Sequence, residues 1–100
     1  MYFTPIFWKD LIDVTEYFMG VEPLQLYNLG LVLGLNQQRV KGWMDSPTFL
    51  DDVITAWLQR EDQVDKKGAP TWKTLVKALR HQRVALVDVA NKIAKDKRIR

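Results

Sequence analysis

The chain has 100 residues, enough for one domain, and a net charge of +3 from 15 basic and 12 acidic residues. Hydrophobic residues make up 47% of it and include four tryptophans, so it can bury a core and is not a disordered segment. Because cysteine is absent, a disulfide framework and a thiolate metal site are excluded, which fits the reducing cytoplasm. The aromatic opening MYFTPIFW is too short and wrongly flanked for a signal peptide or a membrane span, so no membrane insertion is expected.

Three helices are predicted in the first part of the chain. The first covers about residues 7–19 and ends at Gly20. Its apolar face consists of Phe7, Leu11, Val14 and Phe18. Pro23 suits the first turn of the second helix, which ends at Gly34, the usual left-handed cap position. A short third helix follows its N-cap, Asn36. The apolar residues of this third helix are Val40, Trp43 and Met44.

Three more helices are predicted in the second part. Ser46 and Pro47 form an N-cap followed by a proline at the first helical position. The apolar stripe of this fourth helix is Leu50, Val53, Ile54, Trp57 and Leu58. A polar loop, REDQVDKKGAP, follows, and Thr71 caps the fifth helix. Its stripe is Trp72, Leu75, Val76 and Leu79. The sixth helix carries Leu86, Val89, Ala90 and Ile93 and fades into a polar tail.

No segment alternates with period two, so the pattern predicts an all-α protein. The order LGL…V..W…L..V..WL…PTW..L..AL…VA..I, over about residues 10–96, resembles a death domain. The resemblance implies a six-helix antiparallel Greek-key bundle with a core over about residues 7–96 and a basic tail at 97–100. It also implies a module of a larger cytoplasmic protein. Such a module is a non-enzymatic signalling adaptor that recruits effectors in apoptosis or innate immunity.

Charge is divided unevenly along the chain. Residues 1–65 hold four Lys or Arg against ten Asp or Glu, a balance of −6, whereas residues 66–100 hold eleven against two, a balance of +9. For any single charged residue, the alternative to a binding role is that it belongs to a solvated surface. As a whole, the pattern favours association between unlike patches, which steers encounter and fixes register. A contact between unlike patches is heterologous and builds a ring or an open helical oligomer.

The death-domain resemblance implies two kinds of contact with other death-fold domains, either copies of this chain or a heterotypic adaptor. The first joins the fourth helix and the loop after it to a neighbour's corner between the fifth and sixth helices. Its two surfaces in this chain are Arg60, Glu61, Asp62 and Asp65 on one side, and Arg80, His81, Arg83 and Lys92 on the other. The second joins the first and fourth helices to the second and third. Its two surfaces are Asp10, Asp13, Asp51 and Asp52 on one side, and Arg39 and Lys41 on the other.

No catalytic site, metal or cofactor is expected. The one histidine, His81, lies between arginines near the end of the fifth helix and has no nucleophile or orienting carboxylate beside it in the sequence. It is interpreted as a polar group near a helix C-terminus. Asp51 and Asp52 point about 100° apart on a helix and cannot form a dyad on their own. The glycine-punctuated segment 29–34 lacks the Lys-Ser/Thr of a phosphate loop.

The competing function is nucleic-acid binding by a small basic helical domain. A phosphate-facing stripe would comprise Lys73, Lys77, Arg80, Arg83, Lys92, Lys95, Lys97, Arg98 and Arg100. No base-reading set of Asn, Gln or Arg is evident on one helix face, and the acidic part would repel a duplex.

The tryptophans predicted to pack in the core are Trp57, Trp72 and Trp43. For Trp8 two alternatives stay open: it packs on the bundle, or it is exposed and belongs to an interface.

Overall fold

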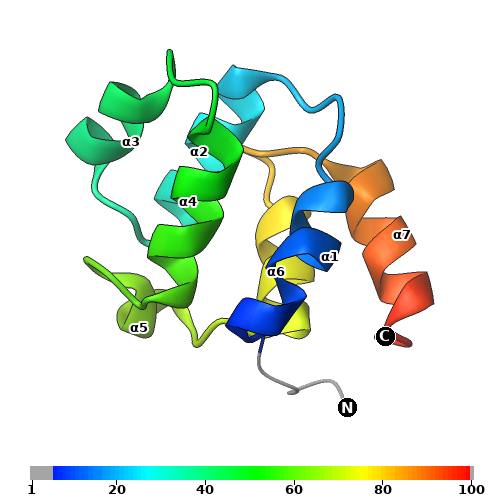
Figure 1. The fold of residues 1–100 in the computed structure, drawn as a ribbon. Coiled ribbons are helices and arrows are strands. Elements are labelled where there is room, and N and C mark those ends of the chain that lie inside the picture. The colour runs from blue at the N-terminus through cyan, green and yellow to red at the C-terminus, as the bar shows by residue number, and fades with distance from the viewer. Residues whose placement is uncertain (1–5, 100) are drawn as a thin grey trace.

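The computed structural model describes residues 6–99, apart from the side chain of Trp8, so the two alternatives for that tryptophan lie outside the described side chains. Over this range the chain forms one 3-10 helix and seven α-helices, and no strand (Figure 1). The elements are η1 (Trp8–Asp10), α1 (Leu11–Glu16), α2 (Pro23–Leu33), α3 (Gln37–Trp43), α4 (Phe49–Leu58), α5 (Val64–Lys67), α6 (Trp72–Leu79) and α7 (Val87–Asp96). The all-α prediction is confirmed.

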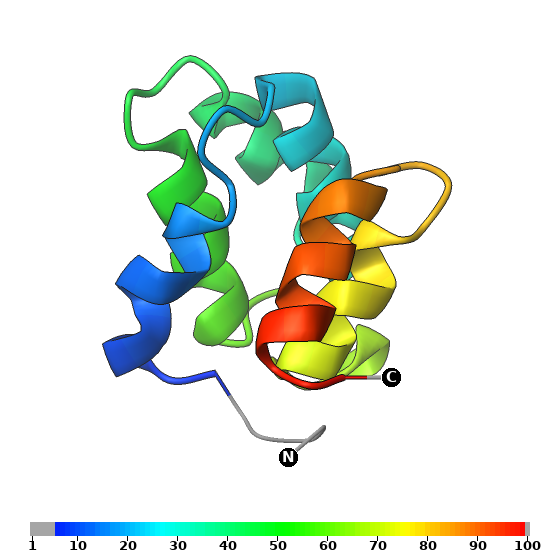
Figure 2. The same ribbon diagram turned by 90° about the vertical axis from the view of Figure 1, so that its right-hand side faces the viewer.

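The helices form a single bundle with a Cα radius of gyration of 12.2 Å and principal extents of 34 × 26 × 26 Å. α6 packs along α7, and α2 contacts α3, α4 and α6. α1 contacts α4, its neighbour on the same side of the bundle (Figure 2). Figure 2 also shows α6 and α7 together on the opposite side. Elements distant in sequence are therefore joined through one shared core.

The core is apolar throughout the described residues, where no polar or charged residue is buried. Trp57 of α4 is completely buried, and Trp72 of α6 is 5% exposed. Trp43 is half-buried and packs against the same cluster. The predicted packing of these three indoles is confirmed. The Trp57 indole N–H has no hydrogen-bond partner among the described residues, so this core contains one unsatisfied donor.

Three predicted helix ends are confirmed by their geometry. The Asn36 side chain accepts hydrogen bonds from two backbone N–H groups of α3, and Thr71 accepts one from the N–H of Thr74 in α6. Gly34 ends α2 with φ at +105°, the left-handed conformation that glycine adopts without steric cost. Gly30, inside α2, lies against Val40 of α3, whose methyl would be 3.3 Å from an added Cβ. A glycine therefore lets these two helices approach closely.

Two helix starts differ from the prediction. The first α-helix begins at Leu11, after the 3-10 turn, and the Phe7 side chain that was assigned to its apolar face is 54% exposed. α4 begins at Phe49, not directly after Ser46 and Pro47. The Ser46 hydroxyl accepts a hydrogen bond from the N–H of Thr48, which closes a local turn before the helix. The serine therefore stabilises the approach to α4 instead of capping it.

The polar loop and the chain end also differ from the prediction. The loop contains the short helix α5, anchored by Val64, whose side chain is fully buried. Residues 97–99 of the predicted polar tail pack on the domain, where Ile99 is only 8% exposed, and Arg100 lies outside the described residues. Ile6, before the predicted core, is 5% exposed, and its N–H donates to the carbonyl of Pro70 at 2.9 Å. The six-helix prediction was wrong in number, since it did not include α5.

Candidate interaction surfaces

The exposed face of α6 is basic because its apolar residues are all used in the core. Its buried positions are Trp72, Leu75, Val76, Ala78 and Leu79. The helical period leaves Lys73 and Lys77 exposed, and Arg80 continues this face after the last turn. The apolar spacing that fixes the helix against the core thus also gathers its positive charges on one side.

The turn after α6 holds two of the predicted basic residues. His81 Nδ1 accepts a hydrogen bond of 3.1 Å from the backbone N–H of Arg83. The carbonyl of His81 accepts from the N–H groups of Val84 and Ala85 at 2.9 and 2.8 Å. Ala85 adopts a left-handed φ of +54°, which reverses the chain toward α7. The His81 ring and the Arg83 backbone are therefore fixed relative to one another.

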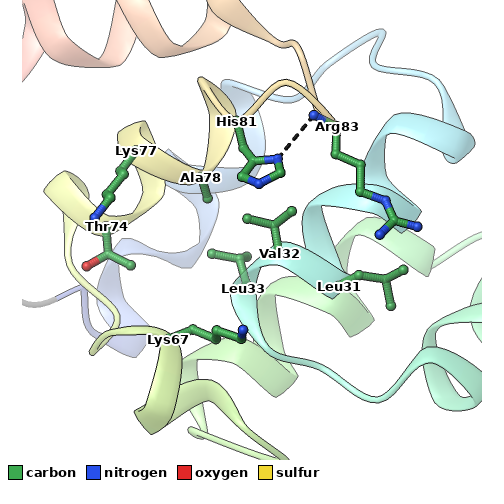
Figure 3. Close-up of a pocket in the computed structure, with 9 residues that line it drawn as sticks. All are labelled: Leu31, Val32, Leu33, Lys67, Thr74, Lys77, Ala78, His81 and Arg83. Carbon is green, nitrogen blue, oxygen red and sulfur yellow. Dashed lines mark hydrogen bonds between the residues drawn. The ribbon is translucent and has the colours of Figure 1, made fainter.

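A hollow of about 360 Å³ lies between the end of α2 and α6 (Figure 3). Its apolar lining comes from Leu31, Val32, Leu33 and Ala78. Its basic lining comes from Lys67, Lys77, His81 and Arg83. In Figure 3, Lys67 of α5 reaches in from the edge opposite His81. The hydroxyl residue Thr74 completes the lining, and none of the described residues around it is acidic.

A second hollow, of about 350 Å³, adjoins the first on the other side of Lys77 and His81, which line both. Its remaining lining is Lys73, Val76, Arg80 and Ile99. We call the two hollows together the basic groove. Each half combines apolar side chains with basic ones, an arrangement that suits an amphipathic acidic ligand.

The predicted acidic surface after α4 is joined to α3 within the same molecule. Arg39 lies 2.6 Å from a carboxylate oxygen of Glu61 and 3.1 Å from one of Asp62. Its guanidinium also lies 5.1 Å from the centre of the Trp43 ring. The hydrogen bond to Glu61 is the main cause that raises the pKa of Arg39 above its ordinary value. The resemblance placed Arg39 on one contact surface and the two carboxylates on another, whereas the structure makes them one cluster.

The cluster of Arg39, Glu61 and Asp62 is also held by a hydrogen bond to the backbone. Asp62 accepts a hydrogen bond of 2.9 Å from the N–H of Asn36, just before α3. The Asp62 backbone has a left-handed φ of +55°, which orients its carboxylate toward that N–H and toward Arg39. The side chains of Glu61 and Asp62 are only 30% and 23% exposed. Part of the negative charge predicted for this surface is therefore compensated internally.

The remaining residues of the first predicted contact lie at three places. Arg60 pairs with Asp65 at 3.3 Å across the start of α5, with both side chains more than half exposed. Arg80 donates to the side-chain oxygen of Asn91 in α7 at 3.3 Å. Lys92, also on α7, lies 5.9 Å from the centre of the Tyr17 ring. Lys92 thus contacts the turn after α1 and does not line the basic groove.

The second predicted contact is likewise only partly assembled. Asp13 of α1 is bound by Lys97, with the charged atoms 2.7 Å apart. Asp10 accepts from the N–H of Phe7 at 3.1 Å, and Asp52 accepts from the Thr48 hydroxyl at 3.2 Å. The two other predicted residues, both exposed, are Asp51 on α4 and Lys41 on α3. The described geometry does not gather the four carboxylates into one site.

Sequence reasoning missed three parts of the basic groove. Lys67 was assigned to a loop, and no site was predicted at the apolar end of α2. Thr74 was not singled out. The one available signal was the pair Lys66–Lys67 just before the basic face of α6, and it does not reveal that α2 ends beside them.

Over residues 6–99 no helix is long and apolar enough to cross a membrane, and no three His, Asp or Glu side chains are grouped to hold a metal ion. No family model, no curated protein and no solved structure matches the chain. The candidate sites therefore depend on the geometry of this molecule alone.

Proposed function

We propose that the chain is a non-enzymatic interaction module of the death-domain kind, which associates with copies of itself or with a related adaptor domain. The proposed setting is cytoplasmic signalling in apoptosis or innate immunity, where such an oligomer recruits effectors. The sequence pattern over about residues 10–96 supports the family. The structure adds an all-helical bundle in which α1 contacts α4 and α2 contacts α6, and the Greek-key order is part of the proposal.

The observation that carries the proposal is the basic groove. Lys67, Lys77 and Arg83 are exposed around apolar side chains, and no described carboxylate lines the same hollow. The −6 balance of residues 1–65 supplies the opposite charge on another part of the molecule. Unlike surfaces of this kind select one orientation of a neighbour and disfavour contact between like surfaces.

The direct test is reversal of one groove charge. Arg83→Glu should weaken self-association, or binding to a partner death domain, by at least about tenfold, because a like charge facing the acidic neighbour costs several kcal/mol. Folding should survive, since an exposed substitution changes stability by about 0.5 kcal/mol or less. Light scattering over a concentration series measures association, and electron microscopy of any large species shows its form.

Salt gives an independent control. The association of the unchanged chain should weaken as salt rises, because the screening length is about 8 Å at physiological ionic strength and about 3 Å at 1 M. Association that is indifferent both to salt and to Arg83→Glu would exclude the basic groove from the contact.

Nucleic-acid binding is the second candidate, favoured by the grouping of Lys67, Lys77, Arg80 and Arg83 around one groove. Filter binding of a random duplex at two salt concentrations separates the two functions. Tight retention that falls steeply with salt is expected only if the groove binds phosphates.

A further inference from the structure

α1 and the turn after it present an apolar ridge that the bundle leaves uncovered. Ile12 is 72% exposed and Met19 is 80% exposed, the two highest values among the large hydrophobic side chains described. The exposed carboxylate of Glu16 lies between them in sequence. Four residues of α-helix from Ile12 to Glu16, and one tighter turn from Glu16 to Met19, bring all three to the same side.

The side chains of the ridge complement those of the basic groove. The ridge presents an apolar, an acidic and an apolar side chain in that order. The groove offers two hollows with apolar linings, and Lys77 and His81 lie between them. The acid-rich loop after α4 is a weaker complement, because Arg39 already binds Glu61 and Asp62.

The two surfaces are carried by elements on opposite sides of the bundle. Figure 2 shows α1 on one side and α6 on the other. A single copy therefore cannot place its own ridge in its own groove. When the ridge of one copy contacts the groove of the next, each copy retains one free ridge or one free groove, and the contact propagates.

We infer that the groove binds the Ile12–Glu16–Met19 ridge of a second copy of this chain, head to tail. Ile12 and Met19 enter the two hollows, and the Glu16 carboxylate lies against Lys77 and His81. This inference rests on the self-association proposed above, and it assigns that association to α1 instead of to the loop after α4.

The test uses two complementary variants, each with one surface disabled. Glu16→Lys removes the ridge and keeps the groove, whereas Lys77→Glu removes the groove and keeps the ridge. Each variant alone should associate at least about tenfold more weakly than the unchanged chain, because like charges then face each other in the contact. Mixed together, they retain one intact ridge and one intact groove, and the two reversed charges also face each other as opposites, so light scattering should find association restored in the mixture.

Asp45→Lys is the matched control, because it makes the same charge change at an exposed carboxylate outside both surfaces. Ile12→Ser tests the apolar part of the ridge without changing charge, and circular dichroism confirms that each variant is folded. If Asp45→Lys weakens association as much as Glu16→Lys, net charge is responsible and the assignment is wrong.

Two further outcomes separate this inference from the proposed function. If the unchanged chain associates and Glu16→Lys and Ile12→Ser have no effect, the ridge is not the occupant, and the proposed function stands. If the unchanged chain remains monomeric at all concentrations and binds no related domain, both are overturned.

Discussion

The ammonium group of Lys97 lies 2.7 Å from the carboxylate of Asp13, across 84 positions of the sequence. The same ammonium lies 4.4 Å from the centre of the Trp72 ring. One side chain near the end of the chain therefore joins α1, α6 and the segment after α7. This contact and the buried Ile99 join residues 97–99 of the predicted basic tail to the folded domain.

Lys97→Ala should lower the free energy of unfolding by about 1 kcal/mol, because a partly exposed ion pair and a cation–π contact are lost together. Urea unfolding at low and high salt measures the loss, which should shrink as salt screens the ion pair. Lys95→Ala, an exposed position on α7, is the control and should change stability by about 0.5 kcal/mol or less. Equal losses in the two variants would show that the contact with Asp13 contributes nothing.

The environment of Tyr17 predicts that part of the folding stability is lost at alkaline pH. Burial is the main cause that raises the pKa of its phenol, and the hydroxyl also donates to Asp96 at 2.8 Å. Because the folded-state pKa is above the unfolded one, this contribution to stability is present below about pH 10 and is lost as the pH rises further.

Tyr17→Phe should therefore cost about 1 kcal/mol at pH 7, and the difference from the unchanged chain should narrow above pH 10. Urea unfolding of both proteins at pH 7, 10 and 11 measures it. All other ionisable groups are the same in both proteins, so the comparison isolates the phenol. Parallel losses of stability in the two proteins over this range would contradict the prediction.

Gly34 and Gly20 can be compared to measure the cost of a side chain where another backbone segment packs against a glycine. Both have positive φ, at +105° and +84°. A Cβ at Gly34 would lie 2.7 Å from the carbonyl oxygen of Gln63, whereas a Cβ at Gly20 would meet nothing within 4 Å. Gly20→Ala should cost about 1 kcal/mol for the backbone conformation alone. Gly34→Ala should cost about 1–3 kcal/mol more in the same unfolding measurement, because the backbone of the α4–α5 loop must move.

Trp72→Ala should lower the free energy of unfolding by about 3–5 kcal/mol. Its ring is almost fully buried and contacts Tyr17 edge-on, with ring centres 6.0 Å apart. Trp43→Ala, at a half-buried indole, should cost clearly less. A loss below about 1 kcal/mol for Trp72→Ala in denaturant unfolding would mean that the indole does not anchor the core.

The sequence predicted best what depends on local chemistry. The caps at Asn36 and Thr71 and the glycine end of α2 follow from residue types whose preference is set within a few positions. The Arg39 contact with Asp62 joins residues 23 positions apart, and nothing in either segment identifies the other. The basic groove was missed for the same reason, since it exists only where the end of α2 lies beside α6. Helix periodicity fixes which face is buried but not which helix covers it.

The hydrogen bonds between the α2–α3 loop and the α4–α5 loop bear on the rate at which a partner could bind there. Gln63 donates its N–H to the carbonyl of Gly34, and the Asp62 carboxylate accepts the N–H of Asn36 in the same α2–α3 loop. Neither loop can rearrange without breaking the other's hydrogen bonds. A partner that docked at this corner would meet a surface fixed by these hydrogen bonds and would lose little conformational entropy on contact. Association there should be limited by diffusion and orientation, without a slow folding step.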